Sequence, residues 1–270
     1  MRTWVRGHPV VAYAVLAYAF SWAWWIPMIV RGEIVRPGVG WPTHLPGLMG
    51  PALAAVVVTA LADGGPGLRD LWSRWTRWRV GWAWWLLVLG TAALAVLGLV
   101  VPLVLGDPVP EVAAFGRYSG IAEIGLLGVT AVALLVNGVG EEAGWRGFAA
   151  DRLLDRHGLR TTALIVAAVW GGWHLPLFWV NESFRTFGLL AVGWAVGLVA
   201  GSIVLTWIYR GSGRSVLLVA AWHTAFNLTS ATEGTGDLVA PLTSVLVIVG
   251  AIWVLRHEAT APERHGSRTR

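Results

Sequence analysis

Eight long apolar runs, separated by short polar or Arg-rich segments, constrain the fold of this chain more than any other feature. A bilayer core about 30 Å thick needs roughly 20 apolar residues in a spanning helix, and each run reaches or approaches that length. The runs lie near residues 9–30, 45–62, 82–105, 121–148, 161–180, 187–209, 215–231 and 238–255. The sequence therefore predicts an all-α, polytopic membrane protein whose helices form a single bundle.

The composition agrees with a membrane protein and removes several kinds of chemistry. Hydrophobic residues make up 56% of the 270 residues and charged residues only 13%, whereas soluble domains carry about 25% charged residues. The basic residues are all Arg and the Cys count is 0, which excludes lysine Schiff bases, thiol nucleophiles and Cys-based zinc sites. The Arg lie between apolar runs, so the net charge of +5 indicates lipid headgroups and no nucleic acid.

The distribution of Arg among the predicted loops indicates how the chain crosses the membrane. Counted by alternate sides, 16 of the 20 Arg lie on the side that holds both termini and segment 63–82. Cytoplasmic loops carry the excess of Arg, so both termini are predicted to be cytoplasmic, in the inner membrane of a bacterium. Segment 63–82 alternates large apolar residues with Arg at helical spacing, which is typical of an amphipathic helix in the membrane interface.

The domain organisation follows from the lack of any Pro- or Ser-rich linker or internal repeat in the sequence. Residues 1–256 are predicted to form a single transmembrane domain, with a functional core at about 120–230. Residues 257–270 are polar and are predicted to form a solvated cytoplasmic tail.

Ionisable residues inside the fourth predicted span are the first candidates for a functional site, because charges in a membrane are costly. This span places Asn137, Glu141, Glu142 and Arg146 within about three helical turns. Glu142 and Arg146 are spaced i, i+4 in the favourable order for an ion pair. Glu141 points about 100° away from Glu142 and has no cation on its own helix, which suits a general base. The alternative is that both carboxylates pair with Arg146 and only stabilise the fold.

Two later spans each contribute a His. His174 follows Trp170 by one turn in the fifth span, and His223 shares a helix face with Asn227 in the seventh. In a water-activation mechanism, Glu141 abstracts the proton, His174 orients the water, and the other two side chains donate to a developing oxyanion. The spacing also permits a zinc ion held by the three ionisable residues, Glu141, His174 and His223, although the sequence has no helical HExxH.

These motifs, in this order on three apolar spans, resemble the CPBP (Abi) family. That family groups type II CAAX prenyl proteases with membrane proteins of bacteriocin processing and self-immunity. The resemblance covers roughly residues 120–230 and rests on three motifs: E-E-x-x-x-R at Glu141, Glu142 and Arg146, aromatic-x-x-x-H at Trp170 and His174, and H-x-x-x-N at His223 and Asn227.

The resemblance implies an intramembrane endopeptidase of the glutamic type, with a site open to the cytoplasmic leaflet. In that picture Glu141 and His174 activate the water, and the last motif supplies the oxyanion hole. Glu142 and Arg146 support the first glutamate. Trp170 stands where the family often has Phe and provides an aromatic wall.

The implied substrate is a membrane-associated peptide or a lipidated protein. No cofactor is expected, and zinc is the open alternative. The rival interpretation is a membrane protein without proteolytic activity, either an immunity scaffold or a proton-coupled transporter whose relay uses Glu141 and the two His. Many transporters show internal repeats, so the lack of one in this sequence favours the enzyme over the transporter.

Overall fold

The computed structural model describes residues 2–260, and the side chains of 236–237 and 259–260 are outside that description. The first half of the chain forms α1 (Arg2–Gly7), α2 (Pro9–Val30), α3 (Leu45–Leu48), α4 (Gly50–Ala62), α5 (Gly64–Trp75), α6 (Trp82–Ala93), η1 (Leu94–Val96), α7 (Leu97–Leu105) and η2 (Val112–Gly116). The second half forms α8 (Gly125–Ala133), η3 (Leu134–Val139), α9 (Gly140–Gly144), η4 (Trp145–Ala150), α10 (Asp151–Leu154), α11 (Leu159–Trp173), α12 (Leu177–Val180), α13 (Glu182–Arg185), α14 (Leu190–Gly211), α15 (Val216–Ser230), η5 (Glu233–Thr235) and α16 (Gly236–Thr260).

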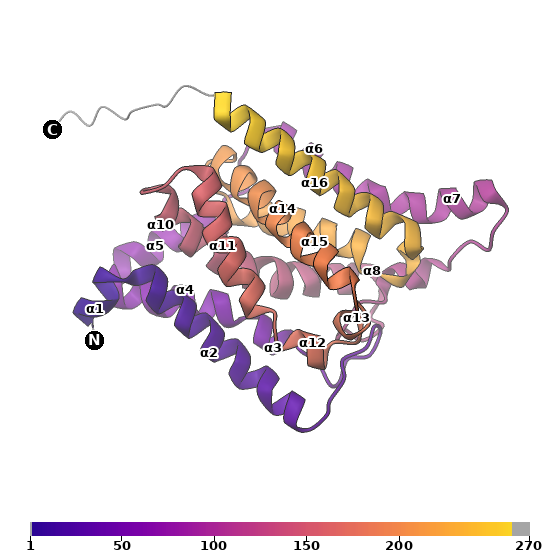
Figure 1. The fold of residues 1–270 in the computed structure, drawn as a ribbon, viewed down its shortest axis with the longest axis horizontal. Coiled ribbons are helices and arrows are strands. Elements are labelled where there is room, and N and C mark those ends of the chain that lie inside the picture. Colours follow the sequence, from indigo (N-terminus) through magenta and orange to yellow (C-terminus); the bar gives the residue numbers. More distant parts are fainter. Residues whose placement is uncertain (1, 261–270) are drawn as a thin grey trace.

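The described helices confirm a polytopic all-α membrane protein. Within residues 2–260, seven helical segments are long and apolar enough to cross a membrane: Pro9–Val30, Leu45–Ala62, Trp82–Leu105, Gly125–Leu154, Leu159–Val180, Leu190–Gly211 and Leu238–Glu258. The remaining predicted span is α15, which has only 15 residues. It packs against α6, η3, α14 and α16, so this short helix lies among the spanning helices. Figure 1 shows α2 and α4 along one edge of the bundle and α6, α7 and α16 along another.

The fourth span is the least regular helix, because two π-helical segments, η3 and η4, flank α9. Single π-helical turns are rare and occur frequently at functional sites. Glycines on this span let its neighbours come close. A Cβ on Gly138 would lie 2.7 Å from Thr224 Oγ1, and one on Gly140 would lie 2.9 Å from Met49 Sδ. The segment that carries the two glutamates is therefore held tightly between α4 and α15.

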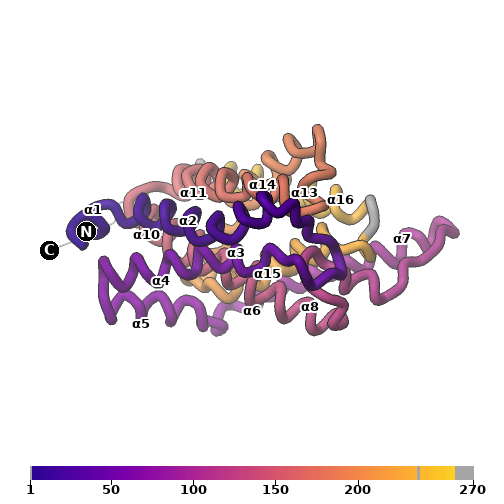
Figure 2. Tube along the Cα trace, turned by 90° about the horizontal axis from the view of Figure 1, so that it is seen from below, coloured from indigo at the N-terminus to yellow at the C-terminus, as the bar shows by residue number. Residues whose placement is uncertain are grey.

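The predicted amphipathic segment forms α5, which ends at Trp75. Figure 2 shows α5 along α4, at the end of the molecule that also holds α1. The exposed face includes Trp72, which is 62% exposed, whereas Leu71 and Arg74 are buried. Arg74 forms ion pairs with Asp70 and Asp151. The helix is thus attached to the end of the fourth span, in addition to offering an apolar face to lipid.

The last helix differs from the predicted tail boundary. Helix α16 continues to Thr260, so residues 257–260 are helical where the sequence predicts a solvated tail. An ion pair between Arg210 and Glu258 joins its last turns to the end of α14. The remainder of the predicted tail, residues 261–270, lies outside the described residues.

Candidate active site

The structure brings three of the predicted residues together around one side chain, Trp170 on α11. Glu141 is on α9, His174 directly follows α11, and His223 is on α15. The exposed fractions of these three residues are 3%, 8% and 6%. A cluster of buried polar groups inside apolar helices is therefore present, as the sequence predicts.

Trp170 links Glu141 to His174 through two different groups. Its indole Nε1 donates to Glu141 Oε2 at 2.8 Å, and its backbone oxygen lies 2.7 Å from His174 Nδ1. A carbonyl oxygen only accepts hydrogen bonds, so Nδ1 of His174 is the donor. The neutral ring then presents Nε2 as an acceptor. Among the described residues Glu141 Oε1 makes no hydrogen bond, so one oxygen and one ring nitrogen are left to bind a third group.

The neighbouring glutamate has a different set of partners, as expected from the angle between the two side chains. Arg146 Nη1 donates to both oxygens of Glu142, at 2.9 and 3.1 Å, and both residues are fully buried. His223 Nδ1 lies 2.8 Å from Glu142 Oε1. The guanidinium of Arg146 also lies 4.8 Å from the centre of the Trp170 ring. Glu142 therefore holds two cation-forming groups beside Trp170, while Glu141 has neither as a hydrogen-bond partner.

The position of Asn227 supports its predicted role less clearly than the positions of the other predicted residues support theirs. It lies one turn after His223 on α15 and is half-buried. Within residues 2–260 its side chain makes no hydrogen bond, and its backbone oxygen accepts from Ala231. Its amide is thus available to a ligand, and its role stays a prediction.

Two residues near the site were not assigned to it from the sequence. Asn137, one turn before Glu141, donates from Nδ2 to the hydroxyl of Tyr118 at 3.2 Å, and its Oδ1 is buried without a partner. Tyr118 comes from the segment between η2 and α8, which has no motif that could have indicated it. The sequence does indicate Asn137, because it places this amide on the same apolar span as Glu141.

Comparison with known proteins finds similarity in the part of the chain that holds these residues. Residues 123–229 match the family described as type II CAAX prenyl endopeptidase Rce1-like, and all seven predicted site residues lie in that range. This part of the chain is therefore similar to the CAAX-protease-like family. The resemblance inferred from the three motifs is confirmed.

A curated protein with a similar sequence extends the comparison. CAAX prenyl protease 2 of Methanococcus maripaludis is 30% identical over 131 residues, which are 45% of this chain and 47% of the relative. The chain thus matches about half the length of that relative.

Zinc binding, which the sequence left open, would need Glu141, His174 and His223 to converge on one ion, and it stays a prediction. Within residues 2–260, no three His, Asp or Glu side chains are grouped as metal ligands. Glu141 Oε2 and His174 Nδ1 are engaged by Trp170, and His223 Nδ1 faces Glu142. We therefore derive the chemistry from the side chains alone.

The two histidines lie at different positions along their helices. Glu141 and His223 lie near the middle of their helices, whereas His174 lies at the C-terminal end of α11. Helix α11 ends there because Gly171 and Gly172 precede it and Pro176 follows.

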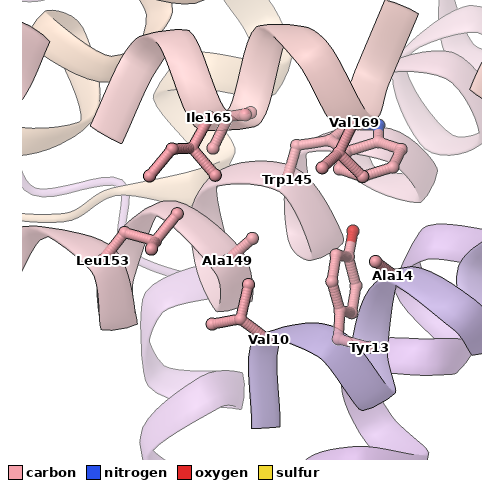
Figure 3. A pocket seen from close by; sticks show the side chains of 9 residues that line it. Val10, Tyr13, Ala14, Trp145, Ala149, Leu153, Ile165 and Val169 are labelled. Carbon is pink, nitrogen blue, oxygen red and sulfur yellow. The ribbon is translucent and has the colours of Figure 1, made fainter. Parts of the chain in front are cut away.

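A small apolar crevice lies on the α2 side of the fourth span (Figure 3). It has a volume of about 10 Å³, which is close to the minimum for one water molecule. Tyr13 and Trp145 line it, and the Tyr13 hydroxyl and Trp145 Nε1 are buried without partners among residues 2–260. The crevice is too small for a peptide, so it is no candidate for the substrate site.

Proposed function

We propose that this chain is an intramembrane endopeptidase that uses Glu141 to activate water against a peptide bond of a membrane-associated or lipidated substrate. The family match supports a peptidase. The observation that carries the mechanism is Trp170, which positions Glu141 by its indole N–H and His174 by its carbonyl oxygen. These two contacts leave Glu141 Oε1 and His174 Nε2 to bind the same water molecule.

The proposed reaction needs one proton acceptor that later becomes a donor. Glu141 accepts one proton of the water. His174 Nε2 accepts a hydrogen bond from the other O–H group and so orients the water molecule. The hydroxide oxygen forms a bond to the peptide carbonyl carbon. As the tetrahedral intermediate collapses, the carbon–nitrogen bond breaks and the proton on Glu141 passes to the leaving amine. No covalent enzyme intermediate is required.

Stabilisation of the oxyanion is assigned to His223 and Asn227. Ionised Glu142 accepts only, so its contact with His223 Nδ1 is favourable when Nδ1 carries hydrogen. The oxyanion role therefore requires the doubly protonated ring, in which Nε2–H is the second donor. Arg146 and His223 then share the Glu142 carboxylate, and the Asn227 amide supplies the other hydrogen bond.

A half-buried aromatic cluster beside His174 supports an apolar substrate. It consists of Phe178, Phe184, Phe187 and Trp194. The ring centres of Phe184 and Trp194 lie 6.0 and 5.4 Å from that of His174. A side chain or lipid group next to the cleaved bond would contact this cluster, which suits a hydrophobic peptide within the membrane.

The test is peptide cleavage by the purified protein in liposomes, using a prenylated peptide and a panel of transmembrane peptides. We expect cleavage to be lost in Glu141→Gln and kept in Glu111→Gln, a matched change at an exposed glutamate. Cleavage that survives Glu141→Gln would contradict the mechanism. Loss on chelation with recovery on added zinc would establish a metal enzyme instead, and proton-linked uptake without any cleavage would indicate a transporter.

The same proposal includes an orientation with both termini in the bacterial cytoplasm, supported by the Arg distribution. The opening of the site toward the cytoplasmic leaflet stays a prediction. The chain has no Cys, so single-Cys variants can be labelled in cells without background. An impermeant maleimide should label Thr186→Cys and spare Ser73→Cys, both of which replace exposed residues. The reverse pattern would invert the topology.

A further inference from the structure

The loop between α2 and α3, residues 31–44, is attached to the segment that follows His174. Val35 in this loop is fully buried, and its N–H donates to Val180 O at 2.7 Å. The N–H of Glu182 donates back to Val35 O at 3.0 Å. Helix α12 begins three residues after His174 and ends at Val180, and Figure 1 shows α12 and α13 beside this loop. The loop therefore holds the backbone that leads away from His174.

The same loop also pairs with the segment between η2 and α8 that carries Tyr118. The N–H of Gly38 donates to Tyr118 O at 3.2 Å, and that of Gly120 donates to Arg36 O at 3.1 Å. The Thr43 hydroxyl donates to Gly120 O at 2.8 Å. Gly120 has a φ of +75°, and a Cβ there would lie 2.8 Å from Thr43 Oγ1, so this close approach requires glycine. The backbone of Tyr118 is thus fixed relative to the loop.

The side chain of Tyr118 extends from these loops to the fourth span. Its hydroxyl accepts from Asn137 Nδ2 at 3.2 Å, and the two residues are 6% and 5% exposed. Asn137 lies in η3 and precedes Glu141 by four residues, so both are on the same side of the span. Burial, and to a smaller extent the charge of Glu141, raises the pKa of the Tyr118 hydroxyl. The contact is therefore close to the carboxylate that is proposed to activate water.

The contact between Tyr118 and Asn137 is not explained by stability alone. Asn137 Oδ1 is buried without a hydrogen-bond partner among residues 2–260. An unpaired buried acceptor costs free energy, which offsets what the hydrogen bond from Nδ2 contributes. An apolar side chain at position 137 would avoid that cost. The hydrogen bond therefore matters more for the position of the span than for the stability of the fold.

We propose that Tyr118 and Asn137 are positioning residues of the candidate active site. Together with the α2–α3 loop, they fix the backbone of Glu141 relative to that of His174. Trp170 links the two side chains, whereas this connection links the two segments of backbone that carry them. To share one water molecule, Glu141 and His174 need a fixed separation, because a displacement of about 1 Å can lower a rate about 100-fold. The inference rests on the proposed function of Glu141.

The experiment compares two Tyr→Phe variants, each of which keeps the ring and removes a buried hydroxyl. Tyr118→Phe breaks the hydrogen bond to Asn137. Tyr209→Phe is the matched control, because its hydroxyl donates to Asp151 at 2.9 Å and, within the described residues, forms no hydrogen bond to the candidate site. The measurements are kcat and KM for peptide cleavage in liposomes, and amide hydrogen exchange over residues 134–144. Thermal unfolding of each variant measures the loss of stability separately.

We expect Tyr118→Phe to lower kcat about tenfold, to leave KM unchanged and to speed exchange in residues 134–144. Tyr209→Phe should lower the melting temperature and leave kcat, KM and that exchange unchanged. Asn137→Leu breaks the same hydrogen bond as Tyr118→Phe, so the two effects on kcat should not add. Unchanged exchange or an unchanged kcat in Tyr118→Phe would overturn the inference, as would additive losses or equal effects in Tyr209→Phe. If the wild type cleaves no peptide, the proposed function is wrong, and the exchange result alone decides the inference.

Discussion

Two groups of buried charges in this molecule differ in how completely they are paired. At the end of the fourth span, Asp151 accepts from the Tyr209 hydroxyl at 2.9 Å and from Arg214 Nη1 at 2.8 Å, and it also pairs with Arg74. In the candidate site, Glu141 is buried to a similar degree, but within the described residues it accepts one hydrogen bond, from Trp170.

This difference distinguishes the paired cluster at Asp151 from the proposed reactive site at Glu141. Asp151 has partners on two other helices, α5 and α14, and on the turn before α15, so the cluster joins the amphipathic helix to the bundle. A buried carboxylate without a cation partner is less stable than a paired one. It also has a free oxygen that can bind water or substrate. Incomplete pairing, more than burial alone, is therefore the property that supports the proposed role of Glu141.

The largest expected effect comes from neutralising the incompletely paired carboxylate. Glu141→Gln should reduce the rate of peptide cleavage by about 10²–10⁴-fold, the usual contribution of a general base. The free energy of unfolding should stay the same or rise, because no ion pair of Glu141 is broken. The measurements are cleavage rate and thermal unfolding on one preparation. A large loss of stability would show that Glu141 is part of the structural network.

Neutralising the fully paired carboxylate should have the opposite pattern. Asp151→Asn leaves Arg74 and Arg214 near a neutral group and should destabilise the protein by about 3–5 kcal/mol. The cleavage rate per folded molecule should change little, because Asp151 contacts none of the proposed site residues. Chemical denaturation and the activity of the folded fraction measure the two effects. If Asp151→Asn lost activity at unchanged stability, the distinction between the cluster at Asp151 and the candidate site at Glu141 would be wrong.

His44 is a third buried ionisable group. The pH dependence of the free energy of unfolding tests how its burial affects stability. It lies just before the span that begins at Leu45, and burial lowers its pKa from 6.5 to about 4. The folded state therefore favours the neutral ring. The stability is complete above pH 6.5 and falls by at most about 3 kcal/mol as the pH drops toward 4. The difference in melting temperature between the wild type and His44→Gln should change across that window and be constant above it.

The sequence was sufficient for the features that depend on local patterns. Apolar run length predicted the spanning segments, and the i, i+4 spacing predicted the ion pair between Glu142 and Arg146, which the structure contains. Helical geometry also predicted that the two adjacent glutamates have different partners. Each of these follows from residues close together in the chain, where the period of the helix determines which side chains meet.

The features that the sequence did not predict depend on contacts between distant segments. Trp170 was expected to be an aromatic wall, and its hydrogen bond to Glu141 joins residues 29 positions apart. The contact between Tyr118 and Asn137 requires a loop to fold back onto the fourth span. His44 lies between the first two predicted spans, yet it is 4% exposed. No periodic pattern indicates which loop residues become buried.

The smallest expected effect comes from replacing Trp170. Trp145, another buried Trp of the same bundle, provides the control. Both are buried, but Trp170 Nε1 donates to Glu141 whereas Trp145 Nε1 has no partner. Trp170→Phe removes a hydrogen bond to a charged group, worth about 1.5–3 kcal/mol, and should slow cleavage by roughly 10- to 100-fold. Trp145→Phe loses only ring area and should leave the rate nearly unchanged. Equal effects on the rate would mean that the ring of Trp170 matters through packing, and that its N–H does not position Glu141.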